Sequence, residues 1–215
     1  MIKIAPSILS ANLLEIENEV KLVDQYGADY IHIDIMDGHY VPNITFGPNI
    51  VKALKKITTK VLDVHLMITP VLNYVEEFIE AGANIITFHP EADYNHDEII
   101  NLILKSNCKP GLAIHPDVKI NSIEHLLPKV ELVTVMTVTP GFGGQKFLES
   151  ELQKISELAK IKKNRQLNFE IEVDGGINDI TAKKCIDHGA NVLVAGSYIF
   201  SNKNSEYKHL IDSLR

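Results

Sequence analysis

Short runs of β-branched residues alternate with longer amphipathic segments along the whole chain, and this alternation restricts the possible folds more than any other feature. The predicted strands cover residues 2–8, 30–36, 61–67, 84–89, 110–115, 132–138, 169–174 and 192–196. Each is followed by one predicted helix, such as 13–25 or 71–81, whose apolar residues share one face. Alternating strands and helices are typical of βαβ units that build a parallel sheet.

Eight such units within 215 residues match a compact (β/α)8 TIM barrel. A doubly wound sheet, the other α/β arrangement, has about five to seven strands. No linker rich in Pro, Gly or Ser interrupts the pattern, so we expect a single α/β barrel domain over residues 1–215. The near-repeats 27–29, 82–84 and 189–191 read Gly-Ala-Asp or Gly-Ala-Asn and precede strands, as expected where glycine ends a helix.

The charge balance argues against a nucleic-acid-binding protein. The chain has 21 Lys+Arg and 28 Asp+Glu, a formal net charge of −7, and its densest basic cluster, 160–165, lies at a predicted helix end. Pro6 interrupts the first apolar run, and no stretch approaches the roughly 20 apolar residues of a membrane span. Cys108 and Cys185 lack metal-binding spacing, and we expect buried, reduced thiols in a cytoplasmic protein.

Three predicted strands carry polar side chains on the face opposite their aliphatic residues. His32 and Asp34 alternate with isoleucines in 30–36, His65 lies in 61–67, and Asp174 ends 169–174. We expect these side chains inside the barrel near its C-terminal mouth, where barrel enzymes have their active sites. Two imidazoles and two carboxylates predict a divalent metal site, with Zn²⁺ as first choice and Fe²⁺, Mn²⁺ or Co²⁺ as alternatives. A buried hydrogen-bonded polar network is the other interpretation.

Other acidic residues and histidines near strand ends are assigned simpler roles. We expect Asp29, Asp37 and Asp63 to serve turns or the bottoms of strands. His89 and His115 also stand at strand ends, and we expect them to be structural residues or to lie at the rim.

Glycine-bearing loops follow the last three predicted strands. They contain Gly141, Phe142, Gly143, Gly144, Gly175, Gly176, Gly196 and Ser197. Glycine allows backbone N–H groups to approach phosphate oxygens closely, and the loops at this place in a barrel often bind phosphate. The loops therefore predict a phosphate group on the ligand, with tight turns that bind nothing as the alternative.

Two carboxylates on one cation, opposite a phosphate site, suit proton transfer next to the ketone of a small phosphosugar. The cation polarises the ketone and stabilises an enediolate, one carboxylate removes the proton and the other returns it. If the two act from opposite faces, the stereocentre inverts, which is epimerisation. Met36, Met67 and Met136 near the mouth predict an apolar cover that excludes water.

Seven motifs spread over the chain carry a resemblance. They are Ala5-Pro-Ser-Ile-Leu-Ser-Ala, His32-Ile-Asp-Ile-Met-Asp-Gly, Val41-Pro-Asn-Ile-Thr-Phe-Gly-Pro, Asp63-Val-His-Leu-Met, Met136-Thr-Val-Thr-Pro-Gly-Phe-Gly-Gly-Gln, Glu172-Val-Asp-Gly-Gly-Ile and Val194-Ala-Gly-Ser. Together they resemble the ribulose-phosphate 3-epimerase family over nearly the whole length. The resemblance implies a ribulose-phosphate binding barrel that interconverts D-ribulose 5-phosphate and D-xylulose 5-phosphate in the pentose phosphate pathway. Proton transfer at C3 then passes through a metal-stabilised 2,3-enediolate.

The resemblance also implies residue roles. It makes His32, Asp34, His65 and Asp174 the metal ligands, with Asp34 the general base and Asp174 the acid in the forward reaction. It implies substrate contacts at Ser7, Met36, His65, Met67, Met136, Gly141, Phe142, Gly143, Gly144, Asp174, Gly175, Gly176, Gly196 and Ser197. The expected partners are a small phosphosugar and further copies of the chain, as a dimer or hexamer, with no nucleic acid and no membrane.

Three other functions are alternatives to this one. Thr139 and His115 depart from the commonest family pattern, and a sister enzyme similar in all four ligands acts on D-allulose 6-phosphate, which is the first alternative substrate. Barrel decarboxylases carry Asp-x-Lys-x-x-Asp, whereas the corresponding positions here are Asp63, His65 and Ile68. A non-catalytic phosphosugar-binding barrel is the third alternative, but binding alone does not need two paired aspartates. We therefore rank the decarboxylase and the binding protein below the epimerases.

Overall fold

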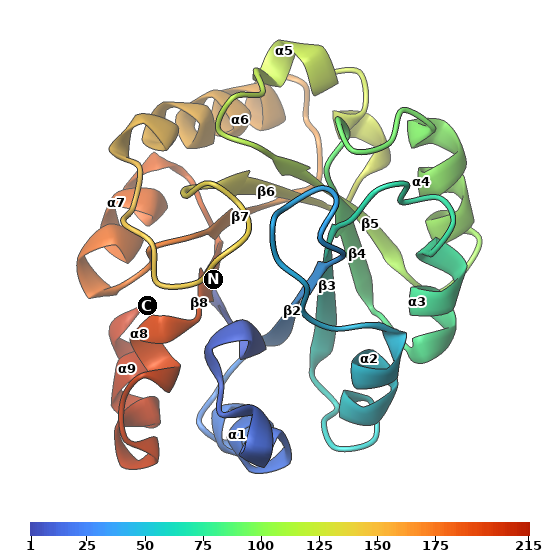
Figure 1. Ribbon diagram of the computed structural model, residues 1–215. Coiled ribbons are helices and arrows are strands. Elements are labelled where there is room, and N and C mark those ends of the chain that lie inside the picture. Colours follow the sequence, from blue (N-terminus) through green and yellow to red (C-terminus); the bar gives the residue numbers. More distant parts are fainter.

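The computed structural model describes residues 1–215, with helices arranged around a central set of strands (Figure 1). The strands are β1 (Lys3–Pro6), β2 (Tyr30–Met36), β3 (Val61–Met67), β4 (Ile85–Phe88), β5 (Lys109–Ile114), β6 (Leu132–Met136), β7 (Glu170–Asp174) and β8 (Val192–Ala195). The α-helices are α1 (Ile16–Gln25), α2 (Pro48–Leu54), α3 (Val75–Ala81), α4 (His96–Leu104), α5 (Ile120–Ile123), α6 (Leu152–Asn164), α7 (Asp179–His188), α8 (Ser197–Phe200) and α9 (Tyr207–Ser213).

All strand pairings are parallel, and the hydrogen-bonded order is β1-β8-β7-β6-β5-β4-β3-β2. The two ends of this sheet meet through an isolated parallel bridge between Ser7 and His32. A backbone bond of 2.9 Å from Asp29 N–H to the Ile4 carbonyl adds to that junction. The sheet is therefore a nearly closed barrel, which confirms the predicted (β/α)8 fold.

Strand boundaries agree with the prediction where the chain continues straight and differ where it turns. The strands expected at 30–36 and 61–67 have these same bounds. The strand expected at 2–8 ends at Pro6, because the Ser7 side chain accepts the Leu9 N–H and starts a 3₁₀ turn. The expectation of one helix after each strand is wrong at β8, which both α8 and α9 follow.

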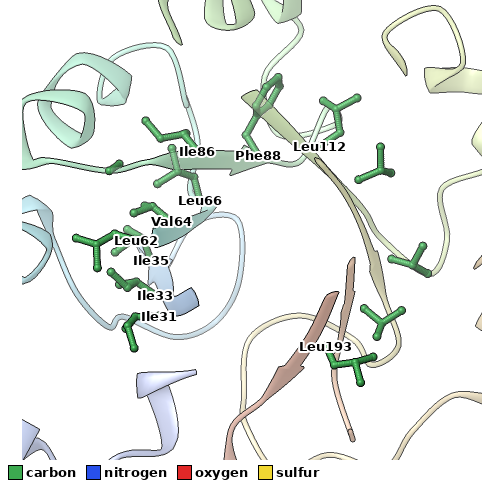
Figure 2. Close-up of a cluster of buried hydrophobic side chains, with 14 of the residues drawn as sticks. Ile31, Ile33, Ile35, Leu62, Val64, Leu66, Ile86, Phe88, Leu112 and Leu193 are labelled. Carbon is green, nitrogen blue, oxygen red and sulfur yellow. The ribbon is translucent and has the colours of Figure 1, made fainter. Parts of the chain in front are cut away.

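The aliphatic residues of the strands form the core between the barrel and its helices. Ile31, Ile33 and Ile35 on β2 are 0%, 0% and 3% exposed and belong to this core. Figure 2 shows them on the same side of the strands as Leu62, Val64 and Leu66 of β3. Removing these side chains from water stabilises the outer layer, and the alternation of a strand then points the intervening polar residues inward.

A smaller apolar cluster fills the barrel interior. Its members come from the inward faces of five strands: Ala5, Tyr30, Ile85, Leu132, Val192 and Val194. They lie near the beginning of most of these strands, whereas His32, Asp34 and Met36 follow Tyr30 along the same face of β2. The interior therefore changes from apolar to polar toward the C-terminal ends of the strands.

The three Gly-Ala-Asp/Asn segments connect helix to strand in the same way. Their glycines, Gly27, Gly82 and Gly189, have φ of +98°, +106° and +113°, which residues with a side chain rarely adopt. In each segment the third residue makes two hydrogen bonds with one residue of the preceding strand. Its N–H donates to the carbonyl of that strand residue, and its side chain accepts the N–H of that strand residue. The pairs are Asp29–Ile4, Asn84–Leu62 and Asn191–Ile171. The near-repeats are thus structural, as expected.

Smaller features follow the sequence. Cys108 and Cys185 are both buried, and neither forms a disulfide. The basic residues at 160–165 end α6, whose last turn contains Lys162 and Lys163. No helix combines the length and the apolar character that crossing a membrane requires.

Candidate active site

The four side chains predicted as metal ligands come together at the C-terminal ends of β2, β3 and β7. One atom from each of His32, Asp34, His65 and Asp174 lies within 4.8 Å of all the others. The ladder between β2 and β3 places His65 directly beside Asp34. Both imidazoles are fully buried, the Asp34 side chain is 6% exposed and that of Asp174 is 15% exposed. Asp174 is therefore the ligand candidate most open to a substrate.

Two ring nitrogens face two carboxylate oxygens at the centre of this group. His32 Nε2 lies 3.4 Å from Asp34 Oδ1 and 3.7 Å from Asp174 Oδ2. His65 Nδ1 lies 3.4 Å and 3.6 Å from the same two oxygens. Neither nitrogen has a hydrogen-bond partner. Tetrahedral ligands at about 2.0–2.1 Å from Zn²⁺ are about 3.3 Å apart, so the donor set and its spacing fit a divalent ion.

The carboxylates and imidazoles of the group favour each other's charged forms. Burial lowers the pKa of His32, but the carboxylates of Asp34 and Asp63 outweigh it and raise that pKa well above its usual value. For His65 burial acts in the same direction and is outweighed by Asp174 and Asp34, so its pKa is raised too. Burial opposes ionisation of Asp34, yet the two imidazoles lower its pKa. The carboxylates thus stabilise positive charge at this point of the barrel, which is what a cation site requires.

His32 is held from behind by Asp63. Its Nδ1 lies 2.7 Å from Asp63 Oδ2, and both side chains are fully buried. The expectation that Asp63 serves the bottom of a strand is therefore wrong, because the register of β2 and β3 places it beside His32. Glu172, which accepts a 2.8 Å hydrogen bond from Thr134, lies next to Asp63, and burial together with Asp63 raises the pKa of Glu172.

His65 is held through another histidine. Its Nε2 lies 3.0 Å from His89 Nε2, and His89 is fully buried rather than at the rim. His89 Nδ1 is 3.3 Å from Glu91 Oε1 without forming a hydrogen bond, and Glu91 Oε1 accepts a 2.8 Å hydrogen bond from Tyr40. Burial lowers the pKa of His89 to about 4. His115 is 23% exposed and lies at the rim.

Asp37 serves a turn, as expected. Its carboxylate accepts the backbone N–H groups of His39, Tyr40 and Thr69. These bonds outweigh burial and lower the pKa of Asp37. The carboxylate ties the segment after β2 to the end of β3.

A single cavity connects the ligand carboxylates with the glycine loops. Its volume is about 540 Å³, a value that includes space open to solvent. Every predicted substrate contact except His65 lines it: Ser7, Met36, Met67, Met136, Gly141, Phe142, Gly143, Gly144, Asp174, Gly175, Gly176, Gly196 and Ser197. Asp34 lines it as well. The loop after β2 and the loop after β6, blue and yellow in Figure 1, are joined by a 2.8 Å bond from the Asn43 amide to the Gly141 carbonyl.

At the end of the cavity formed by β7 and β8, glycines let a ligand approach the backbone closely. A Cβ at Gly175 would collide with Val138, and one at Gly176 would lie 2.7 Å from the Phe147 nitrogen. The N–H groups of Gly176, Gly196 and Ser197 donate no hydrogen bond within the chain. Unpaired N–H groups that converge on a cavity are suited to an anion.

Comparison with known proteins decides the family. The model of the ribulose-phosphate 3 epimerase family matches residues 3–200. The ribulose-phosphate 3-epimerase of Bacillus subtilis is 47% identical over 216 residues, covering 100% of this chain and 99% of the relative. The chain belongs to the ribulose-phosphate 3-epimerase family. It is therefore an epimerase, as the motifs indicate.

Other members are also similar over most of their length. The chloroplastic ribulose-5-phosphate-3-epimerase of Arabidopsis thaliana is 45% identical, covering 94% of this chain and 72% of the relative. The ribulose-phosphate 3-epimerase of Escherichia coli K12 is 40% identical, with coverages of 99% and 94%.

Solved structures of other enzymes share the fold. The 3-keto-L-gulonate-6-phosphate decarboxylase of Vibrio cholerae has a TM-score of 0.72 at 15% identity, covering 100% of this chain and 95% of that one. A variant tryptophan synthase α-subunit of Pyrococcus furiosus has a TM-score of 0.72 at 13% identity, with coverages of 100% and 99%. At these identities the likeness concerns the barrel alone.

The two positions of this epimerase that we expect to depart from the commonest family pattern lie outside the cavity. Thr139 and His115 line a separate cleft together with Tyr40 and Glu91. Residues of the cavity that sequence reasoning missed are Leu9, Ser10, Val138, Pro140, Gln145, Ile177 and Val194. Ser10 stands inside a quoted motif, but only the 3₁₀ turn after β1 brings its hydroxyl close to Gly196.

Proposed function

We propose that this enzyme interconverts D-ribulose 5-phosphate and D-xylulose 5-phosphate, a step of the pentose phosphate pathway, by moving a proton at C3. Asp34 acts as base and Asp174 as acid in one direction, and the roles exchange in the other. One observation carries the proposal. Both carboxylates approach the same two unpaired imidazole nitrogens at 3.4–3.7 Å, in a cavity that is lined elsewhere by glycine loops.

We assign a divalent metal ion to His32, Asp34, His65 and Asp174, with Zn²⁺ in first place and Fe²⁺, Mn²⁺ or Co²⁺ compatible with the same donors. When bound, such an ion polarises the C2 carbonyl of the substrate and stabilises the negative charge that develops on it. The two buried ring nitrogens without a hydrogen-bond partner support this assignment.

Ser7 prepares Asp34 for proton transfer. Its hydroxyl donates a 2.6 Å hydrogen bond to Asp34 Oδ2, which fixes the orientation of the carboxylate while Oδ1 faces the imidazoles. Asp34 removes the C3 proton to give a 2,3-enediolate, and Asp174 returns a proton to the other face. Because Asp34 and Asp174 project from β2 and β7, which are not neighbours in the barrel, they can reach C3 from two sides.

The remaining cavity residues exclude water and hold the phosphate. Met36, Met67 and Met136 are 3%, 1% and 1% exposed, and their apolar side chains shield the enediolate from solvent protons. No Lys or Arg lines the cavity. We therefore assign the phosphate to the backbone N–H groups of the loops at 175–176 and 196–197, with the loop at 141–144 as a lid.

Proton NMR in D₂O tests the proposal. Metal-replete enzyme with D-ribulose 5-phosphate is expected to introduce deuterium at C3 and to form xylulose 5-phosphate, and a chelator is expected to abolish both. If neither occurs, the ribulose 5-phosphate assignment is wrong. Turnover of D-allulose 6-phosphate instead would transfer the assignment to that hexose, whereas release of CO₂ from a keto acid phosphate would favour a decarboxylase. Phosphosugar binding without any turnover would favour a binding protein.

We also propose that the enzyme assembles as a homo-oligomer, a dimer or a hexamer. Apolar side chains that are 56%, 95% and 76% exposed at Leu13, Leu14 and Ile44 support the proposal, because association would remove them from water. Light scattering coupled to size exclusion tests it, and a monomer at micromolar concentration would refute it.

A further inference from the structure

The two imidazoles of the site are supported in different ways through their second ring nitrogens. His32 Nδ1 meets a carboxylate, Asp63, at 2.7 Å. His65 Nε2 meets another imidazole nitrogen, His89 Nε2, at 3.0 Å. A contact between two ring nitrogens is a hydrogen bond only if one carries a proton and the other does not. The His65–His89 pair therefore has a direction, which the rest of the site determines.

Metal binding fixes that direction. An imidazole that binds a metal through Nδ1 keeps its proton on Nε2. His65 must then donate, and His89 must accept through a bare Nε2. The proton of a neutral His89 then lies on Nδ1, which is 3.3 Å from Glu91 Oε1, close enough for a charge pair but not aligned for a hydrogen bond. Glu91 Oε1 accepts the Tyr40 hydroxyl at 2.8 Å.

The surroundings of His89 leave its ring little freedom to turn. The ring is fully buried and stacks on His65 with centroids 5.1 Å apart and an interplanar angle of 29°. On Tyr40 the corresponding values are 4.7 Å and 35°. Its two ring nitrogens face His65 Nε2 at 3.0 Å and Glu91 Oε1 at 3.3 Å. His89 is thus clamped between the metal-binding group and a carboxylate.

We propose that His89 and Glu91 are positioning residues, which hold the His65 ring in the tautomer whose Nδ1 is free for the metal. The inference rests on the metal site of the proposed function. In this proposal the contacts that support His65 run through His89 to Glu91. The Glu91 side chain is 28% exposed and lines a cleft with Tyr40 and His115. The support of His32, by contrast, is the fully buried Asp63, with the buried Glu172 beside it.

Zinc affinity of metal-stripped enzyme is the first test, measured by competition with a chromophoric chelator. His89→Leu removes the acceptor and is expected to weaken Zn²⁺ binding by about 10- to 100-fold. His89→Gln offers an amide oxygen in its place and is expected to recover most of the affinity. Glu91→Ala is expected to give an intermediate loss. His96→Leu is the matched control, because the His96 ring lies outside the site, where it is hydrogen-bonded to the Pro90 carbonyl at 2.8 Å. The Zn²⁺ affinity of this variant is expected to equal that of the wild type.

Nitrogen-15 NMR of the unmodified enzyme is the second test and needs no variant. In the Zn²⁺-loaded protein, labelled at histidine, we expect protons on His65 Nε2 and on His89 Nδ1. A proton on His89 Nε2, or unchanged Zn²⁺ affinity in folded His89→Leu and Glu91→Ala, would overturn the inference alone. A wild type that takes up no Zn²⁺ would overturn the metal assignment of the proposed function and this inference with it.

Discussion

At the end of the barrel where the strands begin, Lys3, Tyr30 and Glu170 satisfy one another's hydrogen bonds, whereas at the mouth the ring nitrogens His32 Nε2 and His65 Nδ1, which belong to the predicted ligands, have no hydrogen-bond partner in the chain. The Tyr30 hydroxyl accepts from Lys3 at 2.7 Å and donates to Glu170 at 2.6 Å, and Lys3 pairs with Glu170 at 2.6 Å. His32 Nε2 and His65 Nδ1 face only acceptors beyond 3.3 Å.

The difference separates polar groups that stabilise the fold from polar groups that bind a ligand. A buried group without a hydrogen bond destabilises a protein by about 1–3 kcal/mol, so unpaired groups persist where function requires them. Strand β7 contains both kinds, since Glu170 at its start is paired and Asp174 at its end faces the cavity. Substitutions at the two ends should therefore affect different properties of the enzyme.

The largest expected effect is on turnover. Asp34→Asn and Asp174→Asn keep the shape of the side chain but remove the base or acid, and we expect kcat to fall by about 10²- to 10⁴-fold. A coupled assay for xylulose 5-phosphate measures it, with the thermal midpoint as a check on folding. Glu170→Gln is the control on the same strand and is expected to keep kcat near the wild-type value. Equal decreases in kcat for Asp174→Asn and Glu170→Gln would contradict the functional difference between the two ends of the barrel.

Metal removal should act on stability as well as on activity. An ion present at 1,000 times its dissociation constant stabilises the folded state by about 4 kcal/mol. We expect a chelator to lower the thermal midpoint of the wild type and to leave that of His65→Ala unchanged. The same midpoint with and without Zn²⁺ in the wild type would contradict a cation site at the mouth.

Substitution at the other end should affect stability alone. Glu170→Ala takes the shared acceptor from Lys3 and Tyr30, and because the Lys3 and Glu170 side chains are partly exposed we expect a loss of about 1–2 kcal/mol. Urea unfolding measures the loss. The kcat of the folded enzyme is expected to be unchanged, and a large decrease in kcat would show that the network communicates with the mouth.

The smallest effect is a pH dependence at Tyr30. Burial and Glu170 raise the pKa of Tyr30 above its usual value, so its contribution is complete below the unfolded pKa of about 10 and is lost as the pH rises above it. At pH 7 we expect Tyr30→Phe to be less stable by about 1 kcal/mol. Urea unfolding at neutral pH and near pH 11 should show that this difference shrinks. A constant difference would mean that the hydroxyl is not held by Glu170.

The face of each ligand residue could be predicted because a strand's own alternation decides it. His32 and Asp34 share a face whatever the neighbouring strands do, and the isoleucines between them identify that face as inward. The ends of the strands were less accessible to this reasoning. At Ser7, for example, a side-chain bond to the Leu9 backbone, and not hydrophobicity, ends β1.

The residues behind the ligands could not be predicted from period alone. Asp63 contacts His32 because β2 and β3 pair in one particular register, and no single strand contains that information. His89 follows β4 like a rim residue, and it reaches His65 because β4 pairs with β3 in the register that places Thr87 beside His65. Glu91 lies in the loop after it, where sequence pattern gives no direction to a side chain.

X-ray absorption at the zinc edge of Zn²⁺-loaded, desalted enzyme tests most directly whether the unpaired groups at the mouth bind a metal. The account predicts a single ion per chain with only nitrogen and oxygen donors, and with the outer-shell scattering of two imidazoles, from His32 and His65. A shell without imidazole scattering, or a protein that retains no ion, would contradict it.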